Sequence, residues 1–216
     1  MPGFALVNHK VVSVPVAPGR EVLAKRGAML AYSGDVRFRP VSGPRPGLGG
    51  LVGRALSGEA APLMVAEGSG QVSYGYAGLA VHLVHLDGTG SLSVESDRLL
   101  CHDAGLQTAV VFLGQQGGVR GAVRGAVTGQ GLFTTQVSGV GDVAVLAHGG
   151  VLELPVGGRP VVVDPQAYVG HVGAVQVDVS ASVGWRDAVG RGSGEAVQLR
   201  LSGSGSVLVQ ASEERF

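Results

Sequence analysis

The stretch LMVAEGSGQVSY at Leu63–Tyr74 decides the fold, because related stretches follow it twice along the chain. They are TQVSGVGDVAVL at Thr135–Leu146 and LRLSGSGSVLVQ at Leu199–Gln210. In each stretch an alternating apolar run leads into Gly-x-Gly, and a second run follows. Such alternation is typical of half-buried strands, and glycine permits the positive φ of a hairpin turn and the close approach of two chains. We therefore interpret each stretch as two strands that meet at the paired glycines. A phosphate-binding loop would need a following helix, which the pattern does not predict.

A second block of sequence also occurs three times and alternates with the first. It is EVLAKRGAMLAY at Glu21–Tyr32, SLSVESDRLLCH at Ser91–His102 and PVVVDPQAYVGH at Pro160–His171. Repeats of this kind indicate a structural unit whose apolar face is covered by the next copy. We predict a single all-β domain over residues 1–216, a pseudo-symmetric β-sandwich or barrel-like fold. It consists of three degenerate repeats of roughly 70 residues, at about 20–78, 79–150 and 151–212.

The composition favours a protein that associates with copies of itself. Glycine makes up 38 of the 216 residues without a Gly-X-Y period, which indicates many tight turns between short strands and excludes collagen. Charged residues are only 15% of the chain, against about 25% in an average globular protein. A surface with so few charges indicates either a very compact molecule or apolar area that is buried against another copy or a membrane.

Charge is unevenly distributed along the chain. Residues 1–58 carry eight basic and two acidic side chains, whereas residues 59–216 carry eight basic and fourteen acidic ones. One interpretation is an anion-binding face for nucleic acid or an anionic membrane, with Arg37, Arg39, Arg45 and Arg54 as its contacts. The other, which we favour, is pairing between the two parts of the chain across subunit contacts.

The cysteine count and the hydropathy pattern favour a cytoplasmic location. The single cysteine, Cys101, excludes an intrachain disulfide, which suits a reducing compartment. The first fifteen residues lack the features of a signal peptide, and no apolar run reaches the ~18 residues of a membrane span. Peripheral contact with a membrane stays open.

Several longer stretches together resemble bacterial members of the altered-inheritance-of-mitochondria twenty-four family. They are GAMLAYSGDV (Gly27–Val36), GLGGLVGRALSGE (Gly47–Glu59), GLFTTQVSGVGDVAVLAHGG (Gly131–Gly150) and GEAVQLRLSGSGSVLVQ (Gly194–Gln210). The resemblance implies a fold like that of the tryptophan RNA-binding attenuation protein, a ring-like or trimeric assembly, and no established catalytic activity. No Lys/Arg set recurs in all three repeats, so RNA binding does not carry over to this chain.

The histidines and Cys101 are the candidates for chemistry. His82 and His85 are three residues apart on an expected strand, so they point to opposite faces and cannot share a metal without a bulge. His102 and His171 occupy equivalent repeat positions, with Tyr32 in the third, so pseudo-symmetry could bring them together at a metal or small-ligand site. The alternative is that they are polar residues of edge strands. We interpret Cys101 as a small buried residue, because the neighbouring His102 would face the other way.

No motif in the sequence indicates an enzyme or a cofactor. HExxH, CxxC and Walker sequences are absent, and the carboxylates are scattered. We expect a non-catalytic, homo-oligomeric scaffold or binding protein, with a trimer favoured and nucleic acid a less favoured partner. The expected contact segment is Gly47–Leu56, with a membrane, a protein partner or another subunit as the alternatives. Its candidate residues, together with one aromatic residue that could instead pack over a strand end, are Arg45, Leu48, Leu51, Val52, Arg54 and Trp185.

Overall fold

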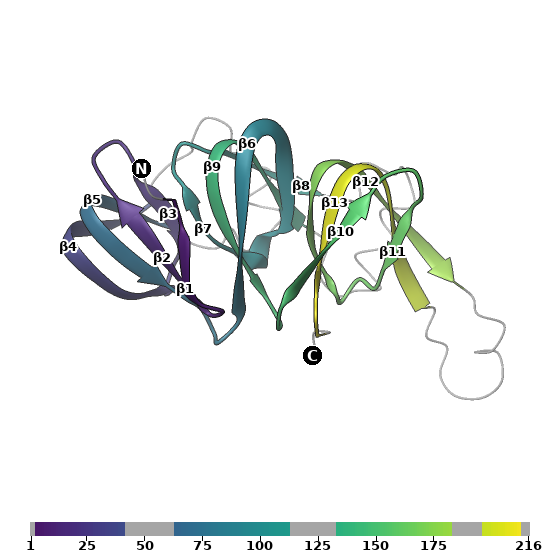
Figure 1. Cartoon of the computed structure of the whole chain (residues 1–216), viewed down its shortest axis with the longest axis horizontal. Helices are drawn as coiled ribbons and strands as arrows, with labels where there is room; N and C mark the ends of the chain where they lie inside the picture. Colours follow the sequence, from purple (N-terminus) through teal and green to yellow (C-terminus); the bar gives the residue numbers. More distant parts are fainter. Residues whose placement is uncertain (1–2, 42–62, 113–132, 183–195, 213–216) are drawn as a thin grey trace.

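The computed structural model describes residues 3–41, 63–112, 133–182 and 196–212. Its regular elements there are strands, apart from one short 3-10 turn at Ser96–Arg98. The all-β prediction is therefore confirmed. The strands form three lobes that lie in a row along the longest axis of the molecule (Figure 1).

Each lobe is continuous in sequence. The first contains β1 (Ala5–Asn8), β2 (Val11–Val16), β3 (Val22–Lys25), β4 (Met29–Pro40) and β5 (Leu63–Tyr74). The second contains β6 (Ala80–Glu95), β7 (Leu99–Asp103), β8 (Gln107–Phe112) and β9 (Phe133–Ala147). The third contains β10 (Val151–Val156), β11 (Val161–Val163), β12 (Tyr168–Ser182) and β13 (Ala196–Gln210).

The strand that carries Gly-x-Gly is the centre of each lobe. In the first lobe β4 pairs with β5 along its length, while β2 and β3 pair with its two halves. In the second lobe β6 follows the whole of β9, and β7 and β8 pair with its two halves. In the third lobe β12 follows β13, and β10 and β11 pair with its halves. All of these pairings are antiparallel.

The expectation of a hairpin at the paired glycines is wrong. β5, β9 and β13 each run without interruption through Gly-x-Gly, so the glycines lie inside one long strand. The expected positive φ and close approach are both present: Gly68 has φ 116° and Gly203 has φ 112°. A Cβ atom on either residue would overlap a backbone oxygen of the paired strand, that of Asp35 or Ala174. Glycine is therefore required because two backbones meet there.

Alternating apolar residues form the buried face of β2. In β2, the side chains of Val12, Val14 and Val16 are buried and those between them are less so. Three hydrophobic clusters follow the row of lobes. The first also includes Leu100 and Leu146 from the second lobe. The first two lobes therefore share buried surface.

Two strand pairings join the lobes into one thirteen-stranded sheet. β3 pairs antiparallel with β7, which connects the first lobe to the second. The second half of β6 pairs antiparallel with β12, which connects the second lobe to the third. Backbone hydrogen bonds thus continue across both boundaries.

Candidate functional site

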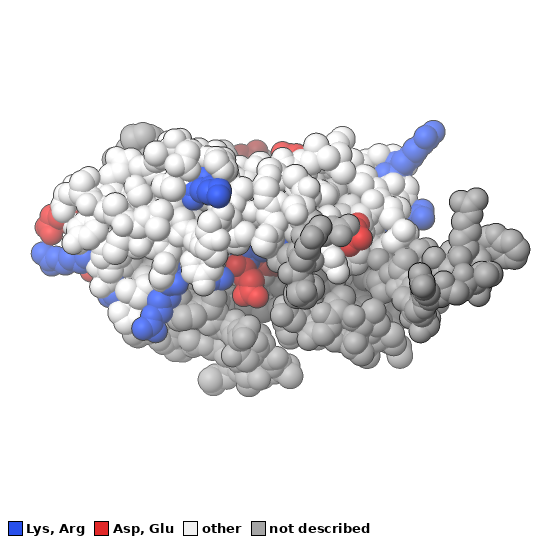
Figure 2. Space-filling model, turned by 90° about the horizontal axis from the view of Figure 1, so that it is seen from below, with Lys and Arg blue, Asp and Glu red and all other residues white. Residues whose placement is uncertain are grey.

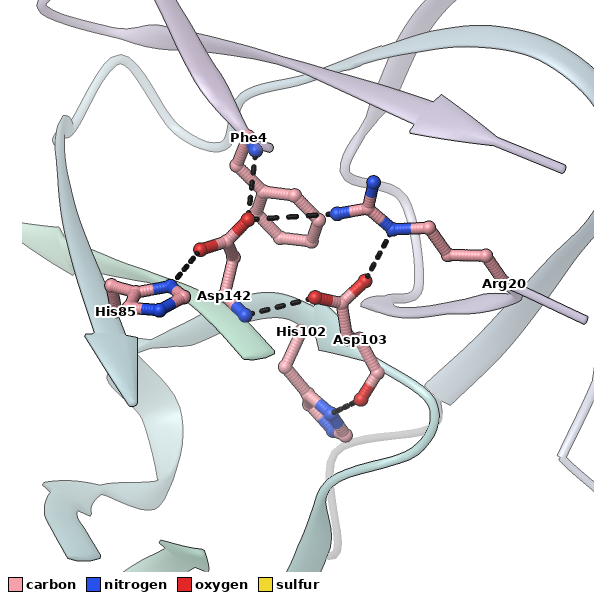
Figure 3. Close-up of polar contacts among 6 residues, drawn as sticks. All are labelled: Phe4, Arg20, His85, His102, Asp103 and Asp142. Atoms are coloured by element: carbon pink, nitrogen blue, oxygen red, sulfur yellow. Dashed lines mark hydrogen bonds and ion pairs between the residues drawn. The ribbon is translucent and has the colours of Figure 1, made fainter. Parts of the chain in front are cut away.

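A cluster of charged side chains lies where the first lobe meets the second (Figure 3). Arg20 precedes β3, Asp103 ends β7, and Asp142 lies inside β9. Arg20 Nε donates to Asp103 Oδ1 at 3.2 Å, and Arg20 Nη2 lies 3.6 Å from Asp142 Oδ2. All three side chains are largely buried. One guanidinium thus bridges two carboxylates from different strands of the neighbouring lobe.

Two further residues complete this cluster. The backbone N–H of Phe4 donates to Asp142 Oδ2 at 3.0 Å, and that of Asp142 donates to Asp103 Oδ2 at 2.8 Å. The exposed His85 ring places Nδ1 2.7 Å from Asp142 Oδ1. All four carboxylate oxygens therefore contact donors or the His85 ring, and the cluster holds the N-terminal segment and Arg20 onto the second lobe. This geometry is typical of a structural joint.

A second polar pair lies at the junction of the second and third lobes. The hydroxyl group of Tyr168 and Nδ1 of His171 are 2.7 Å apart, and both residues are buried. Burial lowers the pKa of His171 to about 4 and raises that of Tyr168. His171 is therefore neutral at neutral pH, and it is held inside the junction.

The expected meeting of His102, His171 and Tyr32 does not occur within the chain. His102 lies at the first junction, where its Nδ1 is 2.8 Å from the carbonyl oxygen of Asp103. His171 lies at the second junction, and Tyr32 lies in β4, in the first lobe. Because the lobes form a row, these positions are separated (Figure 1). In the described part of the chain, no group of three His, Cys, Asp or Glu residues could hold a metal ion.

The other candidates for chemistry in the described strands are His82, His85 and Cys101. His82 is half-buried, which lowers its pKa although Glu153 opposes the shift, whereas His85 is exposed. Cys101 is buried, as expected. Burial, with a smaller contribution from Asp103, raises the pKa of its thiol, so the reactive thiolate is disfavoured.

Exposed large apolar residues occur on β1, β4, β9, β10 and β11. The largest group, Met29, Leu30 and Tyr32, lies at the start of β4, and Val162 lies in β11; the sequence did not single out either strand as a contact. Within the described residues, β4 pairs only with β5, and β11 pairs only with β13. Both strands therefore present an unpaired backbone edge beside apolar side chains. The repeat alignment could have indicated the β4 edge, because it places the exposed Tyr32 at the same position as the buried His102 and His171.

The Arg20 cluster has no counterpart among the sequence patterns. Arg20 and Asp103 are 83 positions apart, and no local pattern connects them. The expected contact residues Arg45, Leu48, Leu51, Val52, Arg54 and Trp185 lie outside the described residues. No helix among the described elements is long and apolar enough to cross a membrane.

The family model for mitochondrial biogenesis AIM24 matches residues 4–212. The chain belongs to the AIM24 family. This agrees with the resemblance seen in the sequence, and the match covers all three lobes. The family name refers to mitochondrial biogenesis and states no biochemical activity.

A solved structure shares the fold of this AIM24 family member. The crystal structure of a protein from Streptococcus pyogenes superposes with a TM-score of 0.69 at 19% identity, covering 97% of this chain and 92% of that one. At this level of identity the likeness shows the fold alone. None of the curated proteins matches the chain significantly.

Proposed function

We propose that this AIM24 family member is a non-catalytic β scaffold that associates with copies of itself, with three copies favoured. The observation that carries the proposal is the exposed apolar edge at each end of the row of lobes, on β4 and on β11. An unpaired strand edge beside apolar side chains is a template for pairing with another chain. The strands around β5, β9 and β13 pair with these central strands in the same way in each lobe, which supports the three-repeat interpretation.

The polar clusters support a structural role in preference to catalysis. The Asp103 and Asp142 carboxylates contact Arg20, the His85 ring and backbone N–H groups, and the Cys101 thiol is buried. A catalytic nucleophile needs an adjacent base and access to substrate. Neither the Arg20 cluster nor the surroundings of Cys101 provide that combination.

Size-exclusion chromatography with light scattering tests the proposal directly. The chain has a mass of 21.7 kDa, and we expect a species of about three times this mass that persists on dilution into the low micromolar range. A monodisperse monomer at all concentrations would refute self-association. Neither outcome depends on an assay of activity.

Binding to nucleic acid or an anionic membrane through the basic first quarter is the second candidate. Arg39 pairs with Glu67 at 2.8 Å, Arg37 lies 3.9 Å from Asp35, and Arg20 pairs with Asp103. Figure 2 shows Lys and Arg side chains scattered over the visible face, not gathered into one patch. Steeply salt-dependent binding to single-stranded RNA or to phosphatidylserine vesicles, lost in Arg37→Ala/Arg39→Ala, would favour this candidate over the scaffold.

A cytoplasmic location belongs to the same proposal. We expect it because the one cysteine is a buried thiol, and cell fractionation tests this.

A further inference from the structure

The two junctions inside the chain use the same short antiparallel pairing. In the first junction, three residues of β3 face three of β7, in the order Val22–Asp103, Leu23–His102 and Ala24–Cys101. In the second, three residues of β6 face three of β12, in the order Leu92–Val172, Ser93–His171 and Val94–Gly170. Each junction thus pairs two different types of strand edge. The first type belongs to β3 and to the second half of β6, and the second type belongs to β7 and to the start of β12.

β11 is the counterpart of β3 and of the second half of β6. Val161 pairs with Leu201, which lies two residues before the first glycine of the pair in β13. Val22 and Leu92 pair with the residues at the same place in β5 and β9. β11 therefore carries the first type of edge, at the end of the row.

The start of β4 is the counterpart of β7 and of the start of β12. Each of these strands begins opposite the residue four places after the second glycine of its central strand. Each also shifts register immediately, between Met29 and Ala31, between Leu99 and Cys101, and between Tyr168 and Gly170. β4 therefore carries the second type of edge, at the opposite end of the row.

Burial shows that these two edges lack the cover that their counterparts have. Leu30 is 57% exposed, whereas its counterpart Leu100 is 0% exposed. Tyr32 is 54% exposed against 1% for His102, and Val162 is 53% exposed against 2% for Leu23. The same strand positions are thus fully covered wherever a neighbouring lobe is present.

We infer that β11 of one copy pairs antiparallel with the start of β4 of a second copy, in the register of the internal junctions. This rests on the proposed self-association and specifies its contact. The expected residue pairs are Val161–Ser33, Val162–Tyr32 and Val163–Ala31. The contact continues the sheet from the third lobe of one copy into the first lobe of the next.

This contact joins different surfaces of identical chains, so the copies are related head to tail. Every such contact leaves one free β4 edge and one free β11 edge until the assembly closes on itself. A two-fold contact between two β4 edges would leave β11 unused. The two arrangements respond differently to substitutions on one edge.

Two substitutions, Tyr32→Glu and Val162→Glu, block one edge each. Both side chains are exposed, so the chains should fold, which circular dichroism and thermal unfolding will check. We expect each variant alone to be a monomer by light scattering. Mixed in equal amounts they should form a dimer of twice the chain mass, because the intact β11 of the first pairs with the intact β4 of the second. Val140→Glu, at an apolar site in the second lobe that is even more exposed, is the control and should assemble like the unmodified chain.

The outcomes separate this inference from the proposed function. If the unmodified chain is a monomer, self-association itself is refuted. If the unmodified chain assembles and both variants still do, the chain self-associates through another surface and the β4–β11 contact is wrong. If only Tyr32→Glu blocks assembly, or the mixture stays monomeric, the head-to-tail arrangement is wrong.

A disulfide tests the register. Opposed residues in an antiparallel pair have Cα atoms about 4.5–5.5 Å apart, which is within disulfide range. We expect Tyr32→Cys/Val162→Cys to give disulfide-linked multimers on non-reducing gels after mild oxidation. Tyr32→Cys/Leu152→Cys, with its second cysteine at an exposed site on β10, should give few. Equal crosslinking of the two double variants would overturn the assigned register.

Discussion

At the scale of single residues, burial of an ionisable group at a lobe junction makes the stability of the fold depend on pH. His171 is the clearest example, since its ring lies against Tyr168 inside the second junction and burial lowers its pKa to about 4. An unfolded histidine has a pKa of about 6.5. The unfolded chain therefore binds more protons than the folded chain between these two values.

We expect His171 to make the protein less stable as the pH falls. Its contribution is complete above pH 6.5, is lost progressively below that value, and reaches its limit near pH 4. Between pH 7 and pH 5 the loss should be on the order of 2 kcal/mol in the free energy of unfolding. Urea denaturation at both pH values, at one protein concentration, measures it. His171→Gln should flatten this pH dependence, and His9→Gln, at an exposed turn, should not; equal slopes in all three proteins would contradict the assignment.

At the scale of elements, the sequence predicted the strands better than their connections. The Gly-x-Gly stretches, predicted to be strands from their alternation, lie inside β5, β9 and β13. The hairpin expected at those glycines was wrong because positive φ has two uses, a turn and a close crossing of backbones, and local sequence does not distinguish them. The Arg20–Asp103–Asp142 cluster could not be predicted, since it depends on which lobes become neighbours.

Gly68 in β5 and Gly203 in β13, whose added Cβ atoms would overlap a backbone oxygen, should tolerate no side chain. Gly203→Ala combines an unfavourable backbone conformation, about 1–2 kcal/mol, with overlap against the Ala174 carbonyl, about a further 1–3 kcal/mol. Gly158→Ala is the matched control, because Gly158 has φ 67° but no atom within 4 Å of the added Cβ. We expect Gly203→Ala to lower the urea midpoint clearly more than Gly158→Ala. Similar midpoints would show that close approach is not what requires glycine there.

At the scale of the whole molecule, the sheet and the shared core make the lobes interdependent. The first hydrophobic cluster contains Val12 and Val72 from the first lobe and Leu100 and Leu146 from the second. The β3–β7 pairing and the Arg20 cluster cross the same boundary. Separation of the first lobe would therefore expose apolar surface and leave two largely buried carboxylates without their cation.

The Arg20 cluster tests this interdependence. Arg20→Ala leaves Asp103 and Asp142 without the guanidinium, and we expect it to lower the free energy of unfolding by about 1–3 kcal/mol. Arg39→Ala breaks an exposed pair with Glu67 and should change it by less than about 1 kcal/mol. Because the first two lobes share a core, the Arg20→Ala loss should shift one common urea transition, followed by far-UV circular dichroism and by hydrogen exchange in both lobes. If amides of the first lobe exchanged early while those of the second kept their protection, the lobes would be independent units joined only by the chain.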